Sequence, residues 1–162
     1  GRIFIDTIKF HKAVAHKVSY TNLYSDSYKG EGAFTLVNTL RGTKNFHDGQ
    51  WQGWIDNNME VTIDLDKEEE ISQVIVGSME NQGSGIYYPI AIEVFVSNDG
   101  NSFRKVGDVK RDFAISGGSE LKNFVVQFPK IKANYVKVKA TKMKQTPNGG
   151  GVWLFVDEIL ID

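Results

Sequence analysis

The stretch MEVTIDL, residues 59 to 65, alternates apolar and polar side chains at every position. Successive side chains of a β-strand point to opposite faces, so this pattern predicts a strand with one face buried and the other in water. The side chains expected on the buried face are those of Met59, Val61, Ile63 and Leu65.

Similar stretches follow along the chain and predict further strands. They cover residues 71–79, 91–97, 103–109, 121–128, 134–143 and 152–161. The second and third of these are joined by NDGN, residues 98 to 101, whose composition favours the positive backbone angles of a tight hairpin turn.

The first third of the chain is less regular. Residues 2–10 and 16–22 read as strands and residues 25–32 as a loop, while only residues 33–40 could form a short helix. Many strands separated by glycine, asparagine and aspartate, with almost no helix, predict an all-β fold, either a β-sandwich or a barrel.

Length and composition narrow the function. A chain of 162 residues fits one domain, residues 1–162. Its 19 basic and 20 acidic side chains offer no broad attraction for nucleic acid or an anionic membrane, so we expect neither partner. The apolar runs are strand-sized and the first residues lack a basic-then-apolar segment, so we expect no membrane insertion and no signal peptide. Cysteine is absent, which excludes disulfides and thiolate chemistry.

Three loops are polar, rich in glycine and carry aromatic residues at or near their ends. They are residues 41–54, 80–88 and 144–153. Loops of a β-sandwich cluster at its two ends, where binding chemistry usually lies. Aromatic faces beside amide, hydroxyl and carboxylate groups suit a sugar, because its C–H groups stack on a ring while its hydroxyls form hydrogen bonds.

Catalytic groups are hard to find in the sequence. His11, His16 and His47 lie in unrelated contexts without the spacing of zinc ligands. The acidic run DKEEE, residues 66 to 70, is expected to be a solvated turn between two strands. The glycine-rich stretches lack the strand-then-helix context and the lysine of a phosphate-binding loop. We therefore expect no enzyme and assign no catalytic residue.

Three motifs in order, NFHDGQWQGW (45–54), MEVTIDL (59–65) and FVSNDGNSF (95–103), resemble the discoidin or coagulation factor V/VIII type C domain. The resemblance runs from about residue 14 to the end. It is greatest to carbohydrate-binding module family 32, as appended to secreted bacterial β-N-acetylhexosaminidases. It implies a jelly-roll β-sandwich that binds a galactose-, GalNAc- or GlcNAc-type glycan residue without hydrolysing it.

The resemblance also implies a biological setting. Modules of this kind are covalently linked to a glycoside hydrolase, which they deliver to glycans, and they are typically monomeric. A secreted, periplasmic or cell-surface location follows from the resemblance alone.

The first loop of similar modules carries a tryptophan pair, one packing inward and one holding the sugar. By this resemblance Trp51 belongs to the core and Trp54 to the ligand, with Gln52 near a position where relatives often present a histidine. Burial of Trp54 in the core is the alternative. His47 and Asp48 line the rim of the site or cap the turn.

The second and third loops supply the remaining expected contacts. Relatives often place a tryptophan where this chain has Gly85, so Tyr87 is expected to be exposed in its place while Tyr88 faces inward. Polar contacts would come from Glu80, Asn81 and Gln82. Trp153, just before the last strand, would stack on the sugar or, equally well, close the end of the sandwich.

The same resemblance implies a structural calcium ion under the binding loops. Asn38 stands where relatives have an aspartate and Thr39 replaces a glycine, while Thr43 and Glu158 are expected as ligands. Calcium takes six to eight oxygen ligands and accepts neutral ones. Loss of the aspartate charge is expected to lower the affinity.

Two other functions compete with glycan binding. An adhesion domain of the discoidin type would bind protein or lipid through exposed apolar spikes or basic loops. A free-standing glycosidase would need two carboxylates about 5 to 10 Å apart across a sugar ring, and Glu80 with Asp48 is the pair to test.

Overall fold

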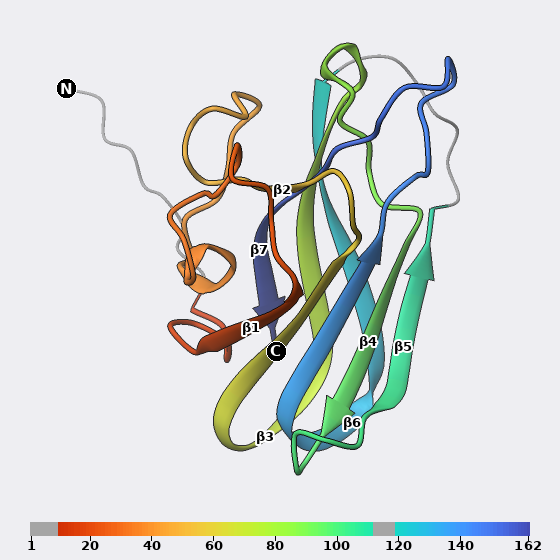
Figure 1. Cartoon of the computed structure of the whole chain (residues 1–162). Helices are drawn as coiled ribbons and strands as arrows, with labels where there is room; N and C mark the ends of the chain where they lie inside the picture. The colour runs from red at the N-terminus through yellow and green to blue at the C-terminus, as the bar shows by residue number, and fades with distance from the viewer. Residues whose placement is uncertain (1–9, 112–118) are drawn as a thin grey trace, which may run out of the picture.

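The computed structural model describes residues 10–111 and 119–162, which form two packed β-layers (Figure 1). The all-β prediction is confirmed. Within the described residues the strands are β1 (Lys17–Asn22), β2 (Gln52–Trp54), β3 (Met59–Asn81), β4 (Ala91–Ser97), β5 (Arg104–Lys110), β6 (Ser119–Thr141) and β7 (Leu154–Ile161). Two short 3-10 turns, η1 (Thr35–Val37) and η2 (Gln82–Ser84), lie in the loops.

The long strands β3 and β6 belong to both layers. The first half of β3 pairs with β1 and with the second half of β6, which continues to β4 and β5. The second half of β3 pairs with the first half of β6 and with β7, and β2 lies beyond β7. Each long strand therefore passes from one layer to the other at a bend.

The sequence predicted each long strand as two, and that prediction is wrong at the bends. The register of β3 against β6 shifts between Asp64 and Glu69, within the acidic run expected to be a turn. Asp66 has a positive φ of 65° there, and its side chain is exposed. The chain bends sharply at this run but keeps strand pairing on both sides, so no loop separates the two halves.

The core lies between the layers and follows the alternation in the sequence. Met59, Val61, Ile63 and Leu65 are all 0% exposed, as predicted. Their neighbours in the other half of the sandwich come from β6 and β7, including Val126 and Val156. A smaller apolar cluster, formed by Trp51, Met79, Ile86 and Phe155, lies nearer the loops.

Four local predictions have different outcomes. The NDGN hairpin between β4 and β5 is confirmed, with φ of 78° at Gly100. The possible helix at residues 33–40 shrinks to one 3-10 turn, and the loop 41–54 contains the short strand β2. Most of the strand expected at residues 2–10 lies outside the described residues.

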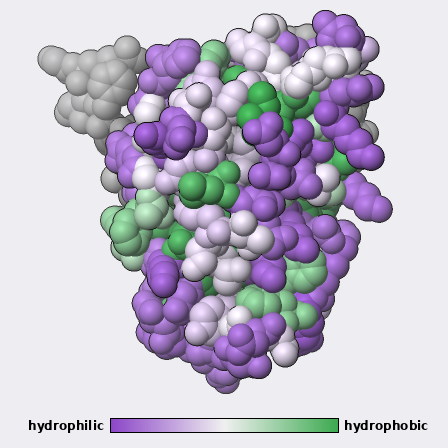
Figure 2. Space-filling view, viewed as in Figure 1, coloured by the Kyte–Doolittle hydropathy of each residue, from purple (hydrophilic) through white to green (hydrophobic). Residues whose placement is uncertain are grey.

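No helix in the described part of the chain is long and apolar enough to cross a membrane. The face drawn in Figure 2 is mostly hydrophilic, and its apolar patches are small and separated. This face therefore has no large continuous apolar patch of the kind that marks an interface with a protein or a membrane.

Candidate functional site

The three aromatic loops and the segment of residues 23–30 gather at one end of the sandwich, opposite the bends of β3 and β6 (Figure 1). Backbone hydrogen bonds tie the second loop to the third: Trp153 N donates to Gly85 O at 2.8 Å, and Tyr87 N donates to Trp153 O at 3.0 Å. The sequence prediction that these loops meet is confirmed. The loop end is thus held by main-chain bonds and not only by side chains.

Four partly or fully exposed ring side chains meet at this end, and we call Tyr28, Phe46, His47 and Trp153 the tip cluster. Tyr28 is at its centre, with ring centroids 5.0 Å from Trp153, 6.1 Å from Phe46 and 5.9 Å from His47. Buried Phe155 lies beneath Tyr28 at 4.6 Å. The Phe46 and Trp153 contacts are edge-to-face and the other two are tilted; such packing fixes the rings in place while the four rings of the tip cluster stay partly or fully exposed.

A hollow of about 280 Å³ opens on one side of the tip cluster, and we call it the first hollow. Its wall combines the rings of Tyr28, Phe46 and His47 with the polar groups of Asp26 and Lys29. The size approaches that of small-ligand pockets, and the mixture of rings and charged groups can both stack on a ligand and hydrogen-bond it.

A second hollow, of about 410 Å³, lies between the second and third loops. Gln82, Tyr87 and Asn148 contribute polar groups to its lining. The third loop is braced by its own bonds, since Thr146 N donates to Gly150 O at 2.9 Å and Gly150 N donates to Thr146 Oγ at 2.7 Å. Trp153 lines neither hollow, but it contacts residues of both, since its backbone is bonded to Gly85 and Tyr87 and its ring packs on Tyr28.

Trp51 is in the core as predicted, at 2% exposure, with Nε1 donating to Thr43 O at 2.8 Å. Its ring lies directly over Gly42, where a Cβ atom would clash with the indole. The prediction that Trp54 faces the ligand is wrong. Trp54 is 1% exposed in the main core, and its Nε1 donates to Asn22 O at 2.9 Å.

Gln52 is also misplaced by the sequence prediction. It is 0% exposed, its Nε2 donates to Gly32 O at 2.9 Å, and its Oε1 accepts from the Tyr20 hydroxyl at 2.7 Å. Burial raises the pKa of Tyr20, which keeps that hydroxyl a donor. Because Gln52 and Trp54 lie on one face of β2, both point inward and neither is available to a ligand.

Glu80 is not a ligand contact in the structure. It is 4% exposed and forms an ion pair with Arg111, in which Arg111 Nη1 lies 2.9 Å from Glu80 Oε2. Tyr88 N donates to the same oxygen at 3.1 Å. Asp48 is also engaged, since it accepts from Thr43 N at 2.6 Å and from the Thr43 hydroxyl at 2.8 Å. The pair considered for glycoside hydrolysis is therefore occupied in holding the loops.

The other residues of the second loop differ in whether they face a hollow or the core. Asn81 caps η2 by accepting from Ser84 N at 3.3 Å, and it does not line either hollow. The predicted exposure of Tyr87 is wrong, since it is 4% exposed, yet it does line the second hollow. Tyr88 faces the main core as expected, and burial is the main cause that raises its pKa to about 12. Gly85 has a φ of 74°, a left-handed backbone conformation that favours glycine over the tryptophan that relatives often have at this position.

His47 and Trp153 are the two sequence-predicted residues that join the tip cluster. The sequence reasoning missed Tyr28 and Phe46. An aromatic residue inside the otherwise polar stretch SDSYKGEG (25–32) was the available signal for Tyr28, and Phe46 adjoins His47 in the first loop. Neither signal shows that the two rings meet, because the segments are brought together only by the fold.

The residues expected to hold calcium do not form a matching donor set. Asn38 Oδ1 accepts from Leu40 N at 2.9 Å, and the Thr43 hydroxyl donates to Asp48. Glu158 is 0% exposed, and its Oε2 accepts from His11 Nε2 at 2.8 Å and from Thr39 N at 2.9 Å. Only Glu158 Oε1 is a buried oxygen without a hydrogen-bond partner among these atoms. One such oxygen is far from the six to eight that calcium takes, so the donors do not fit the ion.

The carboxylates of Glu158 and Asp157 accept hydrogen bonds from other groups of the protein, at the place where a cation would bind. Main-chain N–H groups of Ala13 and Ile161 point to His11 Nδ1, at 3.2 and 3.4 Å, which puts the ring proton on Nε2 facing Glu158. Asp157 accepts from Arg41 Nε at 2.9 Å and from Gly42 N at 2.8 Å. We call these two carboxylates and their four donors the carboxylate clasp. It fastens the loop of residues 39–42 to β7.

Burial raises the pKa of the Glu158 carboxyl, opposed by the hydrogen bond from His11. Across the described ranges no group of three or more histidine, cysteine, aspartate or glutamate side chains could hold a metal ion. The rings and polar groups that line the two hollows offer stacking and hydrogen bonding to a ligand.

The fold is a β-sandwich of the jelly-roll type, and the tip cluster with its two hollows is the candidate site at its loop end. The family follows from comparison with known proteins: the F5/8 type C domain matches residues 17–159, and the chain belongs to this family. No curated protein sequence matches the chain.

Several solved structures with similar folds are carbohydrate-binding modules. CpGH89CBM32-5 from Clostridium perfringens, in complex with GalNAc-β-1,3-galactose, shares 22% identity with a TM-score of 0.57, covering 90% of this chain and 93% of its own. Chitosan-binding module 2 from a chitosanase/glucanase of Paenibacillus sp. IK-5, in complex with chitotriose, shares 18% identity at 0.56, covering 93% and 98%. CBM32-3 from a family 31 glycoside hydrolase of C. perfringens shares 15% at 0.59, covering 90% of each chain. These likenesses establish the fold.

Proposed function

We propose that this domain is a non-catalytic carbohydrate-binding module whose tip cluster holds one sugar residue of a glycan. The observation that carries the proposal is the juxtaposition of four rings with two polar-lined hollows at the rigid loop end. Rings take the C–H face of a sugar, and nearby amide, carboxylate and ammonium groups take its hydroxyls. Structures with the same fold have been solved with sugars bound, which supports this reading.

The proposal extends to ligand class and setting. The sugar is a galactose-, GalNAc- or GlcNAc-type residue, and the module targets a covalently linked glycoside hydrolase, a β-N-acetylhexosaminidase, outside the cytoplasm. Single-site affinity is weak, because a sugar contacts few protein atoms and competes with water for every hydroxyl. Tethering to a catalytic domain and to a polymeric glycan raises the effective affinity.

The test is binding to a glycan panel followed by titration calorimetry with the best ligand. His47→Ala and Trp153→Ala should each weaken binding by about tenfold or more, the equivalent of about 1.4 kcal/mol. His47 is the sharper probe because it is exposed and its side chain makes no hydrogen bond with the described residues.

Phe34→Ala is the matched control. Phe34 is a 53% exposed ring outside both hollows, so its removal should leave affinity unchanged. Equal binding by His47→Ala, Trp153→Ala and the parent chain would reject the tip cluster as the site. Binding to protein or lipid that free sugar does not compete away would favour the adhesion function instead.

A further inference from the structure

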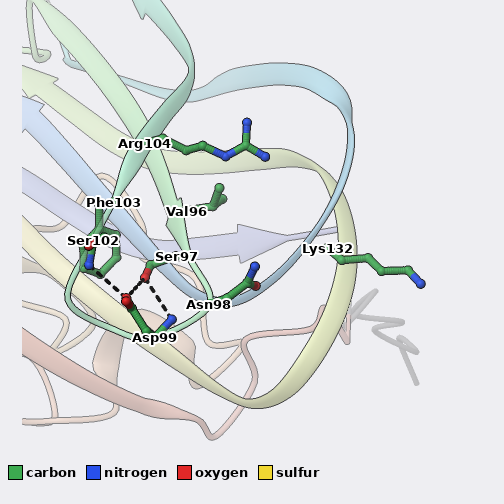
Figure 3. A pocket seen from close by; sticks show the side chains of 8 residues that line it. All are labelled: Val96, Ser97, Asn98, Asp99, Ser102, Phe103, Arg104 and Lys132. Atoms are coloured by element: carbon green, nitrogen blue, oxygen red, sulfur yellow. Dashed lines mark hydrogen bonds between the residues drawn. The ribbon is translucent and has the colours of Figure 1, made fainter.

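A further hollow lies at the opposite end of the sandwich, beside the β4–β5 hairpin (Figure 3). It has a volume of about 340 Å³, and we call it the hairpin hollow. Val96 and Phe103 give it apolar wall, and Lys132, at the bend of β6, forms part of the rim. The described residues that line it are Val96, Ser97, Asn98, Asp99, Ser102, Phe103, Arg104 and Lys132.

The turn that forms this hollow is fixed before any ligand arrives. Asp99 accepts from Asn101 N at 2.8 Å, from Ser102 N at 2.9 Å and from the Ser97 hydroxyl at 2.9 Å. Ser97 Oγ in turn accepts from Gly100 N at 2.9 Å. These bonds, those from Ser102 and Asn101 first, lower the pKa of Asp99. The Asp99 carboxylate is thus committed to the turn and does not pair with the cations around it.

Two cations and an amide remain unengaged around the hollow. Within residues 10–111 and 119–162, the side chains of Arg104, Lys132 and Asn98 form no hydrogen bond or ion pair. Arg104 extends across the hollow and Asn98 points into it, while Lys132 lies at the rim with its ammonium directed outward (Figure 3). Glu70 is the cross-strand partner of Lys132, yet no ion pair joins them.

Neighbouring cations behave differently. Lys105 is 2.6 Å from Asp108 and 3.2 Å from Glu93, so its charge is neutralised on the strand. Lys137 lies 4.1 Å from the ring centroid of Phe103 and covers one face of it. Arg104 and Lys132 therefore differ from the cations next to them, since neither is paired with another described residue: Arg104 extends over the hollow and Lys132 stands at its rim.

We propose that the hairpin hollow is a second site, which binds an oxyanion carried on a sugar, the carboxylate of a uronic acid or a sulfate ester. The guanidinium fork of Arg104 matches an oxyanion in two parallel hydrogen bonds, Asn98 supplies a further donor from inside the hollow, and Lys132 adds a positive charge at the rim. The partly exposed ring of Phe103 receives the sugar ring, above the buried Val96 side chain. The site is independent of the tip cluster, from which it is separated by the length of the sandwich (Figure 1).

The test is amide NMR of the ¹⁵N-labelled chain titrated with trigalacturonate, galactose 6-sulfate, neutral galactotriose and sodium sulfate. The first two should shift amides of residues 97–104 and 132 with a saturable curve, and they distinguish carboxylate from sulfate ester as the preferred group. Neutral galactotriose should shift none of these amides. Arg104→Gln should weaken the acidic sugar by about tenfold, as expected for loss of a charge-assisted bond pair.

Lys105→Gln is the matched control, because it removes one positive charge from the adjacent position without touching the hollow. Its affinity for the acidic sugar should equal that of the parent chain. Equal weakening by Lys105→Gln, equal shifts by neutral galactotriose, or sodium sulfate binding as well as the sugars would each overturn the proposal. Trp153→Ala should leave these shifts intact, so failure of the tip site and failure of this site are told apart.

Discussion

Replacing His11 by alanine tests whether the carboxylate clasp stabilises the fold. Both side chains of the His11–Glu158 pair are 0% exposed, and the imidazole Nε2 is 2.8 Å from the carboxylate. Removing the donor leaves a buried carboxylate with Thr39 N as its remaining partner, and two backbone N–H groups lose their acceptor. Breaking one half of a buried pair costs about 3 to 5 kcal/mol.

For a chain of this length each kcal/mol lowers Tm by about 2 to 4 °C, so His11→Ala should melt roughly 6 to 20 °C below the parent. Urea unfolding at pH 7, followed by circular dichroism, gives the free energy directly. His16→Ala is the matched control, since His16 pairs with Asp66 at 2.9 Å but the two side chains are 27% and 72% exposed. An exposed pair contributes at most about 1 kcal/mol.

A double mutant separates the pair from the space that the imidazole fills. Glu158→Gln removes the charge, so adding His11→Ala to it should cost less than His11→Ala costs in the parent chain. If His11→Ala and His16→Ala destabilise equally, or if the two changes at the clasp are additive, the clasp does not hold the loop as argued.

Three further outcomes follow from the same geometry. Trp54→Ala should lower the free energy of unfolding in urea by about 3 to 5 kcal/mol. It should leave the sugar affinity of the folded protein unchanged, which is the opposite of the result expected for His47→Ala. Weakened binding would show that Trp54 belongs to the site after all. Dialysis against a chelator should leave Tm unchanged, because the donors around Glu158 do not fit calcium, and a fall that calcium reverses would contradict this. The Asp99 carboxyl should titrate by NMR below its usual value of 3.8. Its turn-stabilising contribution is present at neutral pH and is lost as pH falls through that lowered pKa; a midpoint at or above 3.8 would refute it.

The strands were readable from the sequence because alternation reports directly which face is buried. Met59 and Val61 illustrate this, since their alternate positions in the predicted strand were enough to predict that both side chains are buried. The bends were not readable. An exposed acidic run such as residues 66–70 has the same composition whether it ends a strand or curves one, and the difference lies in pairing with β6, far away in sequence.

The first loop, residues 41–54, shows a different limit of sequence-based prediction. The resemblance put Trp51 inside and Trp54 outside, as if the loop were irregular between them. Residues 52–54 are instead a strand paired with β7, which puts Gln52 and Trp54 on the same face, toward the main core. Trp51 faces the smaller cluster beside Phe155. Both indoles are therefore buried, on opposite sides of one short strand.

The tip cluster could be predicted only in part. His47 and Trp153 lie in segments whose composition marked them as loops, and both are at the site. Tyr28 is brought there by backbone bonds of its segment to β2, in which Gly53 N donates to Tyr28 O at 3.1 Å. This bond joins two main-chain atoms of segments that are far apart in the sequence. The identities of the side chains in either segment therefore do not predict it.

The continuity of β3 and β6 through both layers has a mechanical consequence. A sandwich whose sheets are joined only by loops can shear when its ends are pulled apart, with one sheet sliding over the other. Here any sliding must break paired residues in both sheets at once, because the same two strands run through each. If the domain holds a polymer at the loop end and is fused to a neighbour, as proposed, tension between the two is carried by the covalent chain and resisted by all the paired residues of β3 and β6 together.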